Sequence, residues 1–287
     1  MIRPIALANS KSGDGSEADI AEWSDQLGLE SRDTGDDLES ALRAAADDRP
    51  PFVAVVGGDG TQRTAATLFA DRGVTLLPVP GGTRNHFAKA LGLADLDDAA
   101  AAVTSGIQRD VPLSDLNGEA FLNTAVVGWY PEMVRTRERL RDRYPRPIAA
   151  AAALALHAHR LHRFNVEVAG STHRAWMLWV GNGRFGLTPN ELSARADLTD
   201  HVLDIRIALA HRRFARARVV WDLVRGRLKG SDHLERFVAD GPVVARLGAG
   251  PVSAALDAEI VTIANPLVFT PASRKVRVLA APSARAE

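Results

Sequence analysis

The main structural signal in this chain is the stretch Val55-Val56-Gly57-Gly58-Asp59-Gly60-Thr61. An apolar run from Phe52 to Val56 predicts a buried strand, and a helical pattern from Thr61 to Ala70 follows the glycines at once. Glycines let a ligand approach the backbone closely, and the free amides at a helix start favour phosphate oxygens. The stretch therefore predicts a phosphate-binding turn. The alternative is an ordinary tight turn with Thr61 capping the helix.

Similar strand, loop and helix units lie on both sides of this stretch. Ile5 to Ala8 is a short apolar run that leads into Asn9 and a loop rich in serine and glycine. Val74 to Val79 leads into a second glycine turn, Pro80 to Gly82. Loops that follow parallel strands open on the same edge of a sheet, where such folds bind ligands. Residues 1–112 are therefore predicted to form an α/β domain with a parallel sheet and a nucleotide site.

The pattern changes after Gly106, where strand-like segments follow one another with few helices between them. The predicted strands are Phe121 to Val127, Phe164 to Val168, Ala175 to Val180, Leu203 to Leu209, Val243 to Leu247, Val252 to Leu256, Glu259 to Ile263 and Val276 to Leu279. Two helical insertions lie between them: Met133 to Leu161, which Pro145 and Pro147 interrupt, and Phe214 to Leu228. Residues 113–281 are therefore predicted to form a mainly antiparallel, β-sandwich-like domain, and residues 282–287 a frayed tail.

The composition is that of a globular protein and not of a disordered or disulfide-stabilised chain. The 287 residues include 35 basic and 35 acidic side chains, no cysteine, and 46% hydrophobic residues. The balanced charge argues against binding nucleic acid, which requires a basic face. The longest apolar run, Ile148 to Leu156, is too short for a membrane helix, which needs about 20 residues. We therefore expect a cytoplasmic protein with no nucleic-acid partner.

Two loops resemble the signature loops of the bacterial diacylglycerol kinase-like lipid kinases, which are relatives of sphingosine kinases and, more distantly, of NAD kinases. The first loop is Gly57 to Thr61 and the second is Gly82 to Ala88. Phe121 to Asn123 and Val180 to Gly183 are also similar to segments of this family. The resemblance implies a kinase that uses ATP and Mg²⁺ to phosphorylate a lipid hydroxyl. It further implies diacylglycerol or a related lipid as acceptor, and a role in phospholipid biosynthesis.

The resemblance also assigns site residues. The positions that match the family's nucleotide contacts are Asn9, Ser12, Gly13, Thr34, Gly57, Gly58, Asp59, Gly60, Thr61, Thr83 and Asn85. Asp59 is expected to act through Mg²⁺ or on the acceptor hydroxyl, and Glu259 to take the proton from that hydroxyl. Asp200 matches an aspartate that holds a structural Mg²⁺. Without the resemblance, the simpler interpretation of Glu259 is a carboxylate on a β-hairpin, and that of Asp200 is a turn residue.

Several positions depart from the family pattern. Gln62, Arg63 and Thr64 replace a hydrophobic residue, an asparagine and a glutamate, His86 replaces an aspartate, and His201 and Ala258 replace glycines. Two other functions therefore stay under consideration. One is NAD kinase-like transfer to a soluble acceptor, for which Asn190-Glu191 is the candidate acceptor-binding pair. The other is a nucleotide- or lipid-binding module that has lost catalysis.

The first helical insertion is rich in arginine. The basic residues that precede the apolar run Ile148 to Leu156 are Arg135, Arg137, Arg139, Arg141, Arg143 and Arg146. A basic, partly apolar helix suits anionic headgroups, so this segment predicts peripheral contact with the inner face of the membrane. The alternative is a solvated charged face over a core helix. The expected partners are thus a lipid substrate and a bilayer surface, and a homodimer is considered as well.

Overall fold

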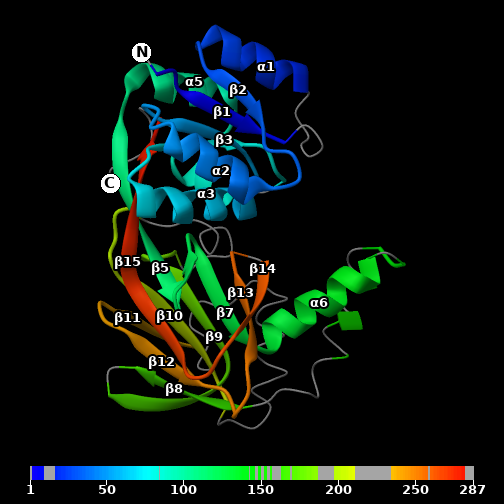
Figure 1. Cartoon of the computed structure of the whole chain (residues 1–287). Helices are drawn as coiled ribbons and strands as arrows, with labels where there is room; N and C mark the ends of the chain where they lie inside the picture. The colour runs from blue at the N-terminus through cyan, green and yellow to red at the C-terminus, as the bar shows by residue number, and fades with distance from the viewer. Residues whose placement is uncertain are drawn as a thin grey trace. The chain divides into compact units, whose positions relative to one another are not determined.

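The structure, a computed structural model, describes most of the chain (Figure 1). The described residues are 2–9, 17–83, 85–141, 143–145, 148–149, 152–153, 156, 163–168, 170–186, 197–210, 234–257 and 259–281. The chain divides into two units: Met1–Leu113, Asp197–Asp200 and Ala272–Glu287 form the first, and Ser114–Ala196 and His201–Pro271 form the second. Two long strands contribute residues to both units, because the division falls within β5 (Gln108–Leu116) and β15 (Leu267–Leu279).

A parallel sheet forms the centre of the first unit (Figure 1). Its strands are β1 (Ile5–Ala8), β2 (Glu30–Asp33), β3 (Val53–Gly57) and β4 (Leu76–Pro80), in the order β4-β3-β1-β2. Ile5 pairs with Glu30 on one side and with Val53 on the other. The end of β15 joins β4 in parallel, where Val278 pairs with Leu76. The prediction of a parallel α/β arrangement in the N-terminal part of the chain is thus confirmed.

Helices connect these strands, and the strand order fixes which face each helix covers. The helices are α1 (Glu17–Gln26), α2 (Leu38–Asp47), α3 (Asp59–Arg72), α4 (His86–Ala90) and α5 (Leu96–Ser105). Crossovers between parallel strands are right-handed, and the chain moves from β1 to β2 in one direction but from β2 through β3 to β4 in the other. α1 therefore lies on one face of the sheet, while α2 and α3 lie on the opposite face and contact each other.

The glycine stretch forms the expected strand-to-helix turn, but the helix begins earlier than predicted. α3 starts at Asp59, with Gly58 at the N-cap in extended conformation (φ −82°, ψ −176°). Thr61 is therefore not the helix cap, because the extended backbone at Gly58 places the first helical residue directly after it. The carboxylate of Asp59 consequently lies in the first turn, where the helix dipole favours a negative charge.

The prediction missed strand β5, whose first half is polar. Gln108 to Asp110 carry no apolar alternation, so the sequence offers no strand signal there. Charge pairing with β15 stabilises this half instead: Asp110 accepts from Lys275 Nζ at 2.9 Å and from Arg277 Nε at 3.2 Å. These hydrogen bonds, that from Lys275 above all, hold the pKa of Asp110 below its usual value.

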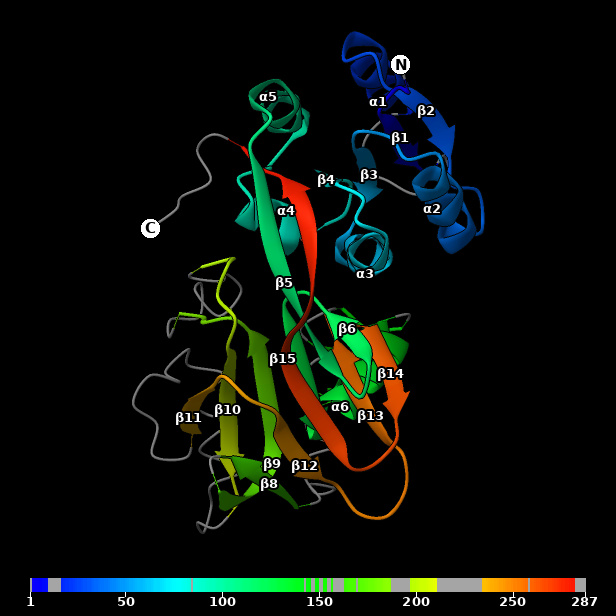
Figure 2. The same ribbon diagram turned by 60° about the vertical axis from the view of Figure 1, so that its left-hand side comes forward.

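The second unit is built from antiparallel strands (Figure 2). The strands are β6 (Glu119–Phe121), β7 (Thr124–Gly128), β8 (Phe164–Val168), β9 (Ser171–Asn182), β10 (Leu203–Leu209), β11 (Leu234–Ala239), β12 (Val243–Arg246), β13 (Val252–Leu256) and β14 (Glu259–Ile263). β9 is central, since it pairs with β7, β8 and β10. The strand predicted over Phe121 to Val127 is in fact two strands, because the backbone leaves the ladder at Leu122 and Asn123. β11 was not predicted.

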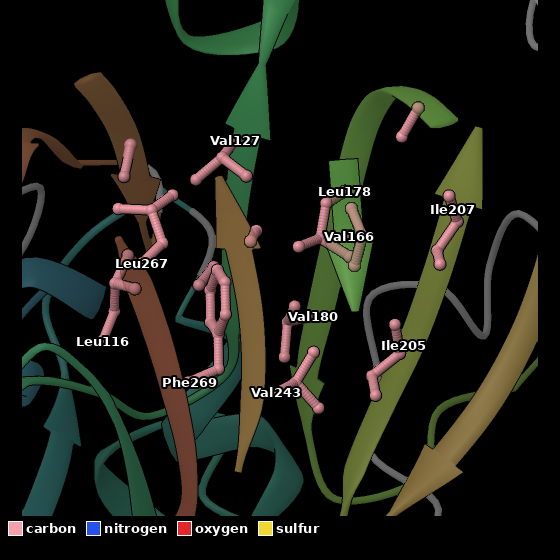
Figure 3. Close-up of a cluster of buried hydrophobic side chains, with 14 of the residues drawn as sticks. Leu116, Val127, Val166, Leu178, Val180, Ile205, Ile207, Val243, Leu267 and Phe269 are labelled. Atoms are coloured by element: carbon pink, nitrogen blue, oxygen red, sulfur yellow. The ribbon is translucent and has the colours of Figure 1, made fainter. Parts of the chain in front are cut away.

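A large apolar cluster forms the core of the second unit (Figure 3). Ile205 and Ile207 lie two residues apart on β10 and so present their side chains to the same face of the sheet. Val180 of β9 and Phe269 of β15 belong to the same cluster, although they lie 89 positions apart in the sequence. Burial of such side chains is the main stabilising contribution of an antiparallel sandwich.

The helical insertions differ from the prediction. α6 spans Trp129–Arg141, so it begins four residues before the predicted Met133, and it ends before Pro145, one of the two prolines predicted to interrupt the insertion. Beyond these prolines, the described residues 148–149, 152–153 and 156 are helical. The second predicted insertion, residues 214–228, lies outside the described residues. Among the helices of the described segments, none combines the length and hydropathy that crossing a bilayer requires.

A buried charge cluster lies beside the core of the second unit. Arg206 and Arg236 stand directly opposite each other on β10 and β11, an arrangement in which like charges repel. The fully buried Asp204 resolves this, because its Oδ2 accepts from Arg206 Nη2 at 2.9 Å and from Arg236 Nη2 at 2.8 Å. The same oxygen accepts the backbone N–H of Phe185 at 3.1 Å, and Arg206 stacks over Trp179.

Replacing Asp204→Asn removes the carboxylate that pairs with both Arg206 and Arg236, while the two guanidinium groups stay in place. We expect a loss of about 3 kcal/mol in the free energy of unfolding, measured by urea titration, because breaking a buried ion pair leaves uncompensated charge. The matched control is Glu167→Gln, which removes an exposed partner of Arg246 and costs at most about 1 kcal/mol. Equal losses in the two variants would contradict the assigned role of Asp204.

Candidate active site

The ends of four neighbouring strands gather polar residues at one edge of the parallel sheet. Asn9 follows β1 and donates through Nδ2 to the carbonyl of Gly35 at 3.2 Å. Thr34 follows β2, and its N–H donates to Ala8 O at 2.9 Å. The glycine loops after β3 and β4 complete this edge. The direction of chain progression reverses between β1 and β3, which is where open parallel sheets bind ligands.

The two glycine loops pack backbone against backbone. The N–H of Gly81 donates to Gly57 O at 3.1 Å. A Cβ on Gly82 would lie 2.7 Å from Cα of Gly58, and one on Gly81 would lie 2.9 Å from the backbone nitrogen of Gly57. Glycine is therefore required at these positions by close approach and not by a left-handed backbone, since neither position has a positive φ.

Asp59 joins the first loop to the second. Its Oδ1 accepts the backbone N–H of Phe87, in the first turn of α4, at 3.1 Å. Among the described residues, no group bonds Oδ2 of Asp59. Carboxylate oxygens are the ligands that Mg²⁺ prefers, so this oxygen fits a Mg²⁺ ion that accompanies a nucleotide.

Asn85 holds the second loop in shape. It is a non-glycine residue in the left-handed conformation (φ +53°), and its side chain is buried. Oδ1 accepts the N–H of Gly82 at 2.9 Å, and Nδ2 donates to Gly82 O at 2.5 Å. The amide of Asn85 is thus bonded to the peptide groups of the loop, while the neighbouring Thr83 is exposed. Direct contacts of both residues with a nucleotide stay predictions.

Glu259 lies in the second unit, at the start of a β-hairpin. It opens β14 and pairs with Leu256 across a turn that begins at Asp257, whose φ is +50°. The carboxylate of Asp257 accepts three backbone N–H groups: those of Leu122 and Asn123 at 2.7 Å and that of Thr124 at 2.9 Å. The position of the Glu259 backbone is therefore set by the buried carboxylate two residues before it.

Asn182 also forms a hydrogen bond to the segment Leu122 to Thr124, whose N–H groups Asp257 accepts. Its Nδ2 donates to Leu122 O at 2.8 Å, and its Oδ1 accepts from Ser114 Oγ at 2.8 Å. Asn182 falls within Val180 to Gly183, a segment similar to the family, but no role was predicted for Asn182 or for Asp257. An aspartate at the first position of a predicted two-residue hairpin was the available signal for Asp257, because such turns favour it.

Other predicted site residues are only partly covered by the structure. Ser12, Gly13, Ala258 and Asn190-Glu191 lie outside the described residues. Asp200 belongs to the short segment Asp197–Asp200 of the first unit. Within the described part of the chain, no three metal-ligating side chains form a cluster, so its role as a Mg²⁺ ligand stays a prediction.

Comparisons with known proteins agree with this geometry. Residues 3–116, which contain both glycine loops and Asp59, match the family model of the diacylglycerol kinase catalytic domain. A protein of Pseudomonas aeruginosa named "Probable lipid kinase YegS-like" is 34% identical over 164 residues, which are 53% of this chain and 52% of that protein. Residues 3–116 thus resemble the diacylglycerol kinase catalytic domain, and about half of the chain is similar to a lipid kinase-like protein.

A second relative and a solved structure extend the likeness. The "Diacylglycerol kinase" of Bacillus subtilis is 36% identical over 103 residues, which are 34% of each protein. The chain thus spans about half the length of the Pseudomonas relative that it matches, and about a third of the Bacillus one. A crystal structure of a diacylglycerol kinase from Bacillus anthracis has a TM-score of 0.68 at 17% identity, covering 99% of this chain and 98% of that one. At this identity the likeness shows a shared fold.

The backbone contact between the loops predicts a specific effect of a methyl group. Gly82→Ala places Cβ against the backbone of Gly58, so we expect a loss of about 1–3 kcal/mol in the free energy of unfolding, measured by urea titration. The control is Gly241→Ala, where an added Cβ meets no atom within 4 Å, and we expect a change of about 0.5 kcal/mol or less. A Gly82→Ala protein as stable as the control would show that the loops are not in contact.

Proposed function

We propose that this chain is a kinase that transfers the γ-phosphoryl group of ATP to the hydroxyl of a lipid. The observation that carries the proposal is the packing of two glycine loops at the reversal point of a parallel sheet, with the carboxylate of Asp59 between them. Backbone N–H groups and the start of α3 favour phosphate oxygens at this edge. The match of residues 3–116 to the diacylglycerol kinase catalytic domain supports the same reaction class.

The reaction requires one proton acceptor and stabilisation of the phosphate charge. The acceptor oxygen attacks the γ-phosphorus, the bond from phosphorus to the bridging oxygen breaks, and ADP leaves. In this proposal the hydroxyl proton passes to the carboxylate of Glu259, which Asp257 positions through its three backbone hydrogen bonds. Mg²⁺, held by Oδ2 of Asp59, would supply neutralisation of the phosphate charge.

Diacylglycerol is the first acceptor to test. The Bacillus subtilis relative carries that substrate in its name, and residues 3–116, which match the diacylglycerol kinase catalytic domain, include the glycine loops. The two alternatives from the sequence predict different products, because an NAD kinase-like enzyme labels NAD and a lapsed module labels nothing. Asn190-Glu191, on which the NAD alternative rests, lies outside the described residues, so the chemical assay separates these functions directly.

The assay uses purified chain, radiolabelled ATP and Mg²⁺, with diacylglycerol in mixed micelles, a broad lipid extract or NAD as acceptor. We expect a labelled lipid, and a fall in kcat of about 100-fold or more in Asp59→Asn and in Glu259→Gln with the fold unchanged by circular dichroism. The control is Asp71→Asn, an exposed carboxylate on the same helix as Asp59, which should retain full activity. Labelling of NAD alone, or ATP binding without any product, would replace the proposal by the corresponding alternative.

A second element of the proposal is the approach to the bilayer that holds the lipid. α6 carries four arginines and two glutamates, a net charge of +2. Glu138 bonds both Arg137 and Arg141, and the hydrogen bond from Arg137 above all lowers the pKa of Glu138. Just after the helix, Tyr144 is 50% exposed and Ile148 is 54% exposed. Basic and apolar side chains in one exposed segment suit an anionic membrane surface.

Co-sedimentation with vesicles of phosphatidylglycerol and phosphatidylcholine tests this surface. We expect Arg139→Glu to weaken binding about tenfold and high salt to weaken binding of the parent, because the attraction is electrostatic. Arg246→Glu, a charge reversal elsewhere in the second unit, is the control and should bind as the parent does. Vesicle binding that changes neither with salt nor in the Arg139→Glu variant would show that α6 is a solvated helix without a membrane role.

A further inference from the structure

Gln62 is a buried amide in the first turn of α3. Its side chain is 1% exposed, and its backbone N–H donates to Gly58 O at 3.0 Å. A buried amide lowers stability unless it finds hydrogen-bond partners, so the surroundings of this side chain show what it does.

Three backbone carbonyls surround the amide nitrogen of Gln62. Nε2 lies 2.8 Å from the oxygen of Val55, 3.2 Å from that of Val79 and 3.4 Å from that of Gly57. All three are acceptors, and Nε2 is the only donor group in the side chain, so the surroundings fix the orientation of the amide. Its two hydrogens are therefore shared between the carbonyls of β3 and β4.

The side chain in this way connects three elements next to the candidate nucleotide site. Gln62 itself belongs to α3, Val55 and Gly57 belong to β3, and Val79 belongs to β4. The first glycine loop begins at Gly57 and the second begins just after Val79. The amide thus bonds carbonyls at the carboxyl ends of β3 and β4, next to both loops.

Stability alone does not account for this amide. Oε1 of Gln62 is buried and has no hydrogen-bond partner within the described parts of the chain. Burying an acceptor without a partner lowers the free energy of unfolding by about as much as one or two hydrogen bonds raise it. The unpaired Oε1 therefore offsets the stability that the hydrogen bonds of Nε2 contribute. A methionine of similar size would fill the space with neither the hydrogen bonds nor the unpaired oxygen.

We propose that Gln62 is a positioning residue of the nucleotide site, whose amide holds the two glycine loops at a set separation. The inference rests on the proposed function, in which the loops bind the phosphates of ATP. Several N–H groups must converge on the same phosphate oxygens, so affinity depends on the separation of the loops. Gln62 acts through the loops and touches no substrate.

The first test compares the parent with Gln62→Met. Hydrogen exchange of the backbone amides in residues 57–60 and 81–83 reports the loops without any ligand, and the KM for ATP reports the site. We expect faster exchange in both loops and a KM for ATP that is about tenfold higher or more, while the urea midpoint stays nearly unchanged.

Gln62→Glu adds a pH signature that a merely structural role would not produce. A carboxylate has no donor for the three carbonyls, whereas its protonated form has one O–H group. Burial beside acceptors favours the protonated form. The KM for ATP of this variant, divided by that of the parent, should therefore fall as the pH is lowered from about 8 to about 6.

The control for general destabilisation is Leu68→Ala, which removes a buried apolar side chain from the same helix. It should lower the urea midpoint and leave the KM for ATP unchanged. If Gln62→Met behaves like Leu68→Ala, with unaltered loop exchange and KM, the positioning role is overturned. A parent protein that binds no ATP would instead refute the proposed function, and loop exchange would still decide whether Gln62 holds the loops together.

Discussion

The backbone contact between the glycine loops constrains the whole carboxyl edge of the parallel sheet. Gly82 approaches Gly58 so closely that no side chain fits between them, and Gly81 donates to Gly57 O. The last residues of β3 and β4 must therefore lie beside each other, and the helices that follow them, α3 and α4, must begin side by side. Only in that arrangement can Asp59 accept from the first turn of α4.

Carboxylates that are buried (Asp204, Asp257) or half-buried (Asp59) repeat this principle in both units. Asp59, Asp204 and Asp257 each accept a backbone N–H from a residue that is 28, 19 and 135 positions away, respectively. A buried charge is costly unless it is paired and hydrogen-bonded, so each of these carboxylates favours one local geometry over its alternatives. Asp59 and Glu259, the two residues proposed to act in catalysis, lie on segments fixed in this way.

Several residues that depart from the pattern of the resembling kinases lie close to the two glycine loops in the sequence. Phosphoryl transfer depends mostly on positioning and charge neutralisation. In the sequence of the glycine loops and the first helical turns, Asp59 is the one acidic residue, since Arg63, Thr64 and His86 carry no carboxylate. The proposed binding of Mg²⁺ therefore depends on Asp59. Gln62 forms hydrogen bonds to both strands, which suits a site whose function depends on the spacing of its loops.

Local patterns in the sequence were sufficient to predict several strands to the residue, among them Ile5–Ala8, Leu203–Leu209 and Glu259–Ile263, because alternation and apolar runs report burial directly. The strand, glycine and helix order likewise predicted the phosphate-type turn. The start of α3 at Asp59, the bonds of Gln62, and the partners of Asp204 and Asp257 were not predictable. A hydrogen bond requires a donor and an acceptor about 3 Å apart, and strand pairing, not sequence separation, brings such groups to that distance.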